Sequence, residues 1–451
     1  MKKMLCLTVV SMVLMGAMSA YGQSRWLTNP LPPPADFLDR LNLRPAWQVR
    51  VPLESRRDGI AEVLPLGDQV LARTYSGTLM AIDAYSGHTQ WIKSPSRSYA
   101  KVQAVGVNDS TVFLVNAETL YALKRSTGRQ LWKHELPNIV TAPPVADEDM
   151  LYLCFAGGEF AGMVLPPTPA APPPGELPAA PAATPPPESM PAGVRSQYAR
   201  STQGYTGYSV RASSYVGYEQ PVVGPRPVTV FSHRLETRLD FPAMLSSRRV
   251  TVAGAASTFF NFVKGYPDDL VRFPVAAGVS APPVAYEDVV YLAGEDKVVY
   301  AQSLETGFVR WRFLECRSPI VQQPAVTNEN VYIVGASTGL HCLDRANGRL
   351  LWRNPDAQQF RAANPKYVYA TNRSGEMLII DRLRGTTLTA ADWRFFNVPI
   401  RNVQTDRLFL AAHNGLLICV YDRDYHSPIW HRIKMEKKPQ PPKENGKVGV
   451  G

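Results

Sequence analysis

Side chains that could carry acid–base or metal chemistry are scattered along the 451-residue chain. None of the seven histidines stands at metal-ligand spacing, and the chain has no G-x-S-x-G, H-E-x-x-H, P-loop or EF-hand sequence. His341 and His413 lie in or near expected strands, where we interpret them as structural. We therefore predict no catalytic residues and no metal ligands. The histidines are His88, His134, His233, His341, His413, His426 and His431.

Some carboxylates occur in pairs that resemble acid–base or metal-binding pairs. Glu148-Asp149 and Glu287-Asp288 are examples, and both stand at the same position of a sequence repeat. We interpret them as turn residues, because Asp and Asn tolerate left-handed backbone and bond to their own main chain. The same interpretation applies to a second recurring set, which consists of Asp83, Asp344, Asp381 and Asp422.

Four cysteines follow the N-terminal segment and leave two interpretations open. Export would permit disulfides, and four cysteines allow three connectivities. Three of the four lie inside apolar strand patterns, which favours small buried core residues instead. There is no vicinal pair, no C-x-x-C and no C-x-x-C-H haem attachment sequence. The four are Cys154, Cys316, Cys342 and Cys419.

The elements that would position any site follow from a repeat. A segment rich in β-branched and aromatic residues recurs eight times, about 40 residues apart, except for one gap of 99 residues. Such segments are typical of half-buried strands. Repeats of this length indicate sheets that are stable only when stacked on neighbours. The segments begin at Gln69, Thr111, Met150, Arg249, Val289, Asn330, Lys366 and Arg407.

A second marker in each repeat is an aromatic residue preceded by a glycine turn. The glycine supplies left-handed backbone at low cost, and the aromatic ring buries a large face. We predict that these residues dock the sheets, with Phe241 and Phe273 replacing the tryptophan in two repeats. The predicted docking residues are Trp91, Trp132, Trp311, Trp352, Trp393 and Trp430, with Gly87, Gly128, Gly307 and Gly348.

Segments such as Ala81–Trp91 and Cys342–Trp352 resemble the tryptophan-docking motif of quinoprotein-like β-propellers. That family includes pyrroloquinoline quinone (PQQ) dehydrogenases and the propeller subunit of the bacterial outer-membrane β-barrel assembly machine. The resemblance implies an all-β, eight-bladed β-propeller over residues 46–433, with seven blades as the alternative. The Trp-Asp dipeptide of WD40 repeats is absent. Closure stays open, because Trp47 and Trp430 both fit the outer strand of the last blade.

The enzymes of this family imply chemistry that the chain does not match. Many carry a Cys-Cys ring beside the quinone, a calcium held by Glu and Asn, and a catalytic Asp, whereas this chain has no vicinal cysteines. We therefore predict no cofactor. The expected function is a non-catalytic scaffold that binds a protein or an envelope polymer. A PQQ-dependent or other cofactor-binding oxidoreductase is the alternative.

The long gap holds a low-complexity insertion, which we place at residues 160–226. Its first part is rich in Pro and Ala, and its second part is rich in Tyr and Arg, so we expect disorder in isolation and a possible partner-binding arm. We predict that it leaves the propeller on the face opposite the glycine turns. The candidate binding residues are Tyr198, Tyr205, Tyr208, Tyr215 and Tyr218.

The ends of the chain bear on location. Residues 1–22 have the basic, apolar and small-residue regions of a signal peptide, with an uncleaved anchor as the alternative. We assign 23–45 to a Pro-rich linker and 434–451 to a basic disordered tail. The net charge of +10 is scattered rather than gathered in a stripe, so we expect no nucleic-acid partner. We predict an extracytoplasmic protein with no membrane span after signal cleavage.

Overall fold

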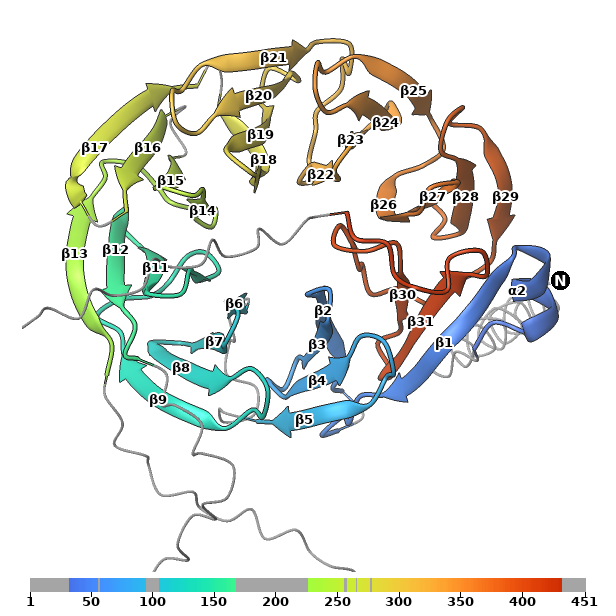
Figure 1. Ribbon diagram of the computed structural model, residues 1–451, viewed down its shortest axis with the longest axis horizontal. Coiled ribbons are helices and arrows are strands. Elements are labelled where there is room, and N and C mark those ends of the chain that lie inside the picture. Colours follow the sequence, from blue (N-terminus) through green and yellow to red (C-terminus); the bar gives the residue numbers. More distant parts are fainter. Residues whose placement is uncertain are drawn as a thin grey trace, which may run out of the picture. The chain divides into compact units, whose positions relative to one another are not determined.

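The computed structural model describes residues 32–55, 57–94, 105–167, 226–254, 258–264, 266–275 and 278–431. Its strands form seven four-stranded sheets and one three-stranded sheet, arranged around a common centre (Figure 1). The predicted eight-bladed β-propeller is therefore confirmed, and the seven-bladed alternative is wrong. The signal peptide, the five candidate tyrosines and residues 434–451 lie outside the described residues.

Each blade runs from an inner first strand to an outer fourth strand. Blade 1 contains β2 (Ile60–Pro65), β3 (Gln69–Thr74), β4 (Leu79–Asp83) and β5 (Thr89–Lys93). Blade 2 contains β6 (Gly106–Val107), β7 (Thr111–Asn116), β8 (Thr119–Lys124) and β9 (Gln130–Glu135). Blade 3 contains β10 (Val145–Ala146), β11 (Met150–Phe155), β12 (Glu159–Val164) and β13 (Val228–Arg234). Blade 4 contains β14 (Met244–Leu245), β15 (Arg249–Gly254), β16 (Thr258–Val263) and β17 (Tyr266–Pro274).

The second half of the ring repeats this order. Blade 5 contains β18 (Val279–Tyr286), β19 (Val289–Gly294), β20 (Val299–Ser303) and β21 (Val309–Phe313). Blade 6 contains β22 (Ala325–Val326), β23 (Asn330–Gly335), β24 (Gly339–Asp344) and β25 (Leu350–Asn354). Blade 7 contains β26 (Gln359–Ala363), β27 (Tyr367–Thr371), β28 (Met377–Asp381) and β29 (Thr387–Ala391). Blade 8 contains β30 (Leu408–Ala411), β31 (Leu416–Asp422) and β1 (Leu43–Arg50).

The core of the propeller lies between blades. One apolar cluster, for example, joins Tyr332 and Leu340 of blade 6 to Val368 and Leu378 of blade 7. The second and third strands of these blades are buried along most of their length because both faces of each sheet meet a neighbour. A single blade would expose these apolar faces, so the sheets are stable together rather than singly.

The ring closes through its N-terminal strand. β1 pairs with β31 in antiparallel register, and Trp47 lies opposite Cys419. Trp47 therefore occupies the outer strand of blade 8, which settles closure. Trp430 forms a bridge with Thr405 at the inner side of the ring, so its predicted role in the outer strand is corrected. The physical reason is that an outer position already paired to β31 leaves no free edge for a second strand.

Helix α2 (Ala35–Arg40) covers the outer side of the closure. Its buried Leu38 packs in one cluster with Trp393, and the rings of Phe37 and Trp393 meet edge to face with centroids 6.1 Å apart. Trp393 follows β29 and packs against this helix, so its predicted docking against a glycine turn is corrected. Both α2 and the start of β1 fall within the range 23–45 that we assigned to the linker.

The four described cysteines are buried and free of disulfides. Burial raises the pKa of the Cys154, Cys342 and Cys419 thiols to about 12, which keeps them protonated and unreactive. The structure therefore favours the core interpretation of these residues. None of the helices in the described part of the chain has the length and apolar character needed to cross a bilayer.

Candidate functional site

Two kinds of connection share one face of the ring. We call it the turn face, and it carries the connections from the first to the second strand and from the third to the fourth strand of each blade. Successive strands within a blade are antiparallel, so these connections emerge on the same side. The glycine turns lie here.

On the turn face, each glycine turn docks on the aromatic ring of the preceding blade. A Cβ atom at Gly128 would lie 2.6 Å from the ring of Trp91, so only glycine allows this approach. The indole Nε1 of Trp91 donates to the carbonyl of Arg125 at 2.7 Å, three residues before the glycine. Gly385 docks on Trp352 in the same way, although we missed it because no tryptophan follows it at the usual spacing. The other pairs are Gly87 with Trp47, Gly307 with Phe273 and Gly348 with Trp311.

One seam uses a different donor. Phe273 lies against Gly307 but has no N–H group, and Asn261 of β16 donates to the carbonyl of Leu304 instead. Phe241 lies between β13 and β14 and packs in the cluster of blades 4 and 5, so its predicted docking role is corrected. A sequence pattern centred on tryptophan could not reveal Asn261, because the amide comes from the neighbouring strand.

The docking turns also place cations over the preceding blade. Arg125 pairs with Asp68, and Arg345 pairs with Glu287 at 3.2 Å. Arg382 pairs with Glu329 at 2.8 Å. These side chains are partly exposed, so each pair contributes at most about 1 kcal/mol.

The insertion joins the propeller at the turn face, which corrects the predicted face. β12 ends at Val164 and β13 begins at Val228, so the insertion links the third and fourth strands of blade 3. Its start at residue 160 is corrected too, because 160–164 belong to β12. Leu165 donates its N–H to the carbonyl of Asp149, as Arg125 does to Ser110 in blade 2. Leu165 also packs in the cluster of Trp132, so the insertion begins where other blades have the docking turn.

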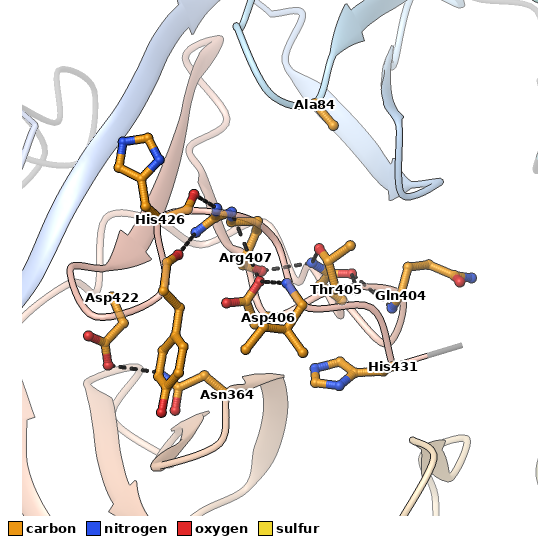
Figure 2. Close-up of polar contacts among 12 residues, drawn as sticks. Ala84, Asn364, Gln404, Thr405, Asp406, Arg407, Asp422, His426 and His431 are labelled. Atoms are coloured by element: carbon orange, nitrogen blue, oxygen red, sulfur yellow. Dashed lines mark hydrogen bonds and ion pairs between the residues drawn. The ribbon is translucent and has the colours of Figure 1, made fainter. Parts of the chain in front are cut away.

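A C-terminal segment crosses the inner side of the turn face. We call residues 425–431 the strap (Figure 2). The guanidinium of Arg407 donates to the carbonyls of Tyr425 and His426. The Asp406 carboxylate accepts the N–H of Ile429 at 3.0 Å, and Ile429 returns its carbonyl to the N–H of Asp406. Burial raises the pKa of the Asp406 carboxyl above its usual value.

The strap ends on His431, which contacts three blades. Its Nε2 donates to the carbonyl of Ala363 in blade 7 at 2.7 Å, and its N–H donates to the carbonyl of Gln404 in blade 8 at 2.8 Å. Its carbonyl accepts the hydroxyl of Tyr286 from blade 5 at 3.2 Å. Burial lowers the pKa of the His431 imidazole below its usual value. The ring of Trp430 lies on Gly67 of blade 1, so the strap touches four blades in all.

Two grooves flank the strap. The first, which we call the strap groove, lies over blades 1 to 3 and reaches Gln404; its charged lining residues are Asp109, Arg125, Asp147 and Glu148. The second reaches Ile429 and His431, and its charged residues other than the imidazole are Glu329 and Arg382. Sequence reasoning missed both grooves, because they need the strap to be placed.

The second recurring set of predicted turn carboxylates bonds to its own main chain, whereas Asp288 accepts the N–H of Ser247 from blade 4 and Glu287 pairs with Arg345 from blade 6. Asp344 accepts the N–H groups of Ala346 and Asn347, and Asp381 does the same for the two equivalent positions of blade 7. In blade 3, however, Asp147 rather than Asp149 accepts the turn N–H groups. Within the described ranges, no group of three or more His, Cys, Asp or Glu side chains could hold a metal ion.

Solved structures share this fold at low identity. BamB from Moraxella catarrhalis matches with a TM-score of 0.56 and 15% identity, over 85% of this chain and 99% of that one. The WD40 domain of SCAP from fission yeast matches with a TM-score of 0.55 and 10% identity, over 86% and 99%. The computationally designed Ika8 protein matches with a TM-score of 0.53 and 12% identity, over 83% and 100%. No curated protein sequence matches this chain significantly.

One protein family matches this chain over two long stretches of its sequence. The family described as outer membrane protein assembly factor BamB matches residues 76–163 and 267–443, which together make up more than half of the sequence. These ranges include the docking turns of blades 1, 2, 5, 6 and 7, and the whole strap. By this match and by its eight blades, the chain belongs to the BamB family of outer membrane protein assembly factors.

Proposed function

We propose that this chain is an exported, non-catalytic scaffold of the cell envelope that binds another protein through the turn face. The observation that carries the proposal is the exposure of apolar side chains there. Leu383, Phe308 and Tyr266 are 86, 76 and 72% exposed, which exceeds every other large apolar side chain in the described residues. Leu383 and Phe308 belong to connections between third and fourth strands, and Tyr266 is the first residue of the fourth strand of blade 4, at its turn-face end. Exposed aromatic and aliphatic anchors on loops are what partner proteins bury.

Four further features support this surface or this location. The insertion with its five tyrosines and the strap both join the propeller at the turn face. The family match supports an envelope role, because the name of that family refers to outer membrane protein assembly. The signal-like residues 1–22 support export.

Photo-crosslinking in cells that produce the chain naturally would test the proposal. A benzoylphenylalanine at position 308 or 383 should capture a partner protein in the envelope fraction. Positions 75 and 314 are matched controls, since Tyr75 and Leu314 are 53 and 64% exposed but lie on the opposite face. Deletion of 168–225 should weaken capture if the insertion contributes to binding.

Three results would contradict the proposal. Capture only from positions 75 and 314 would move the binding surface to the other face, and a chain found only in the cytoplasm would remove the envelope role. The third result is a higher melting temperature of the purified protein when PQQ and calcium are added. A bound ligand stabilises the folded state by mass action, so this result would favour the oxidoreductase alternative.

A further inference from the structure

The second groove beside the strap is formed by three parts of the chain. The strap is one of them, the connection between β22 and β23 of blade 6 is another, and blade 7 supplies the third with two of its connections. The lining side chains that bear on binding are Glu329, Pro365, Arg382, Leu383, Ile429 and His431. Because the strap contributes part of the lining, the groove has this shape only while the strap is docked.

Leu383 connects this groove to the proposed binding surface. Its side chain is the most exposed of the large apolar side chains in the described part of the chain. Its N–H donates to the Asp381 carboxylate at 2.9 Å, which fixes the turn that presents it. Pro365 is also exposed, and Ile429 of the strap is half-buried in the same groove. A protein segment anchored at Leu383 can therefore continue over apolar groups as far as the strap.

The charged side chains of the groove pair with one another. The guanidinium of Arg382 donates to the Glu329 carboxylate at 2.8 Å and to the carbonyl of Asn364 at 3.1 Å. The imidazole of His431 is buried, and its Nε2 donates to the carbonyl of Ala363. A charged side chain of a partner would lose its hydration here without meeting an unpaired opposite charge among the lining residues. The groove therefore favours uncharged, apolar side chains.

The size of the groove also favours a protein segment. Its volume is about 240 Å³, which is less than the roughly 300 to 1,000 Å³ of a small-molecule pocket. We propose that the second groove binds an uncharged apolar segment of the partner protein, and that the docked strap, as part of the groove, raises the affinity for that segment. The inference rests on the proposed function, because Leu383 is an anchor in both.

Contact between the segment and the strap couples binding to docking. The strap is held by Asp406, by Arg407 and by the contacts of His431 with three blades. A segment that touches Ile429 favours the docked strap over the released one, and docking raises the affinity for the segment by the same factor. We expect a factor of at least about 10, within the usual range of roughly 5 to 150 for such couplings.

Peptide selection on the purified full-length protein tests the chemistry of the site. The probe is a random seven-residue peptide library displayed on phage. We expect enrichment of peptides that have no net charge and carry two or more leucine, isoleucine, valine or phenylalanine residues. Synthetic copies of them should bind L383D at least about tenfold more weakly, as expected when an interface anchor is lost. L314D is the matched control, because Leu314 is exposed on the opposite face, and its binding should be unchanged.

Two shortened chains test the coupling to the strap. A chain that ends at residue 424 lacks the strap, and a chain that ends at residue 431 keeps it and serves as the control. The selected peptides should bind the first at least about tenfold more weakly than the second. In the full-length protein, saturating peptide should slow amide exchange at Ile429 by the same factor and leave the turn amide of Gly77, on the opposite face, unchanged. The exchange measurement decides alone if the shorter chain does not fold.

Any of four results would overturn the proposal. Selection of charged peptides or of none, or equal binding to L383D and L314D, would show that the groove is not the site. Unchanged exchange at Ile429 would remove the role of the strap. Much tighter peptide binding to the chain that ends at residue 431 than to the full-length protein would make residues 432–451 the occupant. If position 383 still captures a partner in cells, the proposed function stands while this inference fails, whereas no capture from 308 or 383 would remove both.

Discussion

The indole of Trp311 lies flat against the backbone of Gly348 in the next blade, so closely that a Cβ at Gly348 would be 2.4 Å from its Cε3 atom. The Nε1 of Trp311 donates to the carbonyl of Arg345 at 3.0 Å. Gly348 also has a φ of +74°, in the left-handed region. One glycine thus provides both the turn and the space for the ring between blades 5 and 6.

Alanine substitutions at two glycines can separate the cost of the left-handed backbone from the cost of filling the space of the ring. Gly348 has both features, and Gly157 serves as the control because it has only the first. Gly157 has a φ of +82° but no atom within 4 Å of the position of a Cβ. G157A should lower the free energy of unfolding by about 1 kcal/mol through backbone strain alone. G348A should lower it by about 2 to 5 kcal/mol, because overpacking adds to the strain. Urea midpoints measure both, and equal shifts would mean that the ring contact contributes nothing.

Ring closure by Trp47 predicts a clear difference between two tryptophans. Trp47 is buried against Gly87, and its Nε1 donates to the carbonyl of Ala84, whereas Trp430 is 37% exposed. W47A should lower the free energy of unfolding by about 3 to 5 kcal/mol, the usual cost of removing a buried aromatic ring. W430A should cost less than half of that. Thermal unfolding of both variants decides, and a larger loss for W430A would contradict this closure.

The amide of Asn261 compensates for the absent indole N–H beside Phe273. N261A should leave the carbonyl of Leu304 without this donor in a buried seam and cost about 1 to 3 kcal/mol. Thr251 is a control in the same blade, since its hydroxyl is buried without a hydrogen-bond partner. T251V should therefore be neutral or stabilising. If both variants lose the same stability in urea titrations, the hydrogen bond is not the cause.

Docking of the strap should weaken in mild acid. Because burial lowers the pKa of His431, the docked strap binds fewer protons than the released one. Its stabilisation is complete above about pH 6.5, the usual pKa of histidine, and is lost as pH falls toward the lowered value. Arg382 opposes protonation of the imidazole, and Glu329 favours it. Asp406 acts in the opposite direction, because its raised pKa favours docking at lower pH.

Amide hydrogen exchange at Ile429 and His431 measures this release. After correction for the intrinsic rate, exchange at these two amides should increase as pH falls below about 6.5. H431Q keeps a side-chain donor for Ala363 but cannot titrate, so its exchange should show no such increase. The same increase in H431Q would assign the effect to other groups, such as the buried His341, whose pKa burial also lowers.

Much of the ring was predictable because its signals are local. Apolar strands about 40 residues apart, with turns such as Asp344–Gly348, indicate that each sheet stacks on its neighbours. The insertion was assigned to the wrong face for an equally local reason. Counting residues 160–164 with the insertion leaves out most of β12, and omitting one antiparallel strand moves the predicted connection to the opposite face.

The amino-acid sequence alone determined the eight repeats, the left-handed glycine turns and the absence of vicinal cysteines, because each depends on residues close together in the chain. Three further features become clear only in the folded chain: Trp47 rather than Trp430 closes the ring, each docking glycine lies on the preceding blade, and Asp406 and His431 hold the strap. These relationships join residues from different blades and from both ends of the chain. They form only when the ring of eight blades is closed and β1 has paired with β31, which leaves that edge unavailable to any other segment.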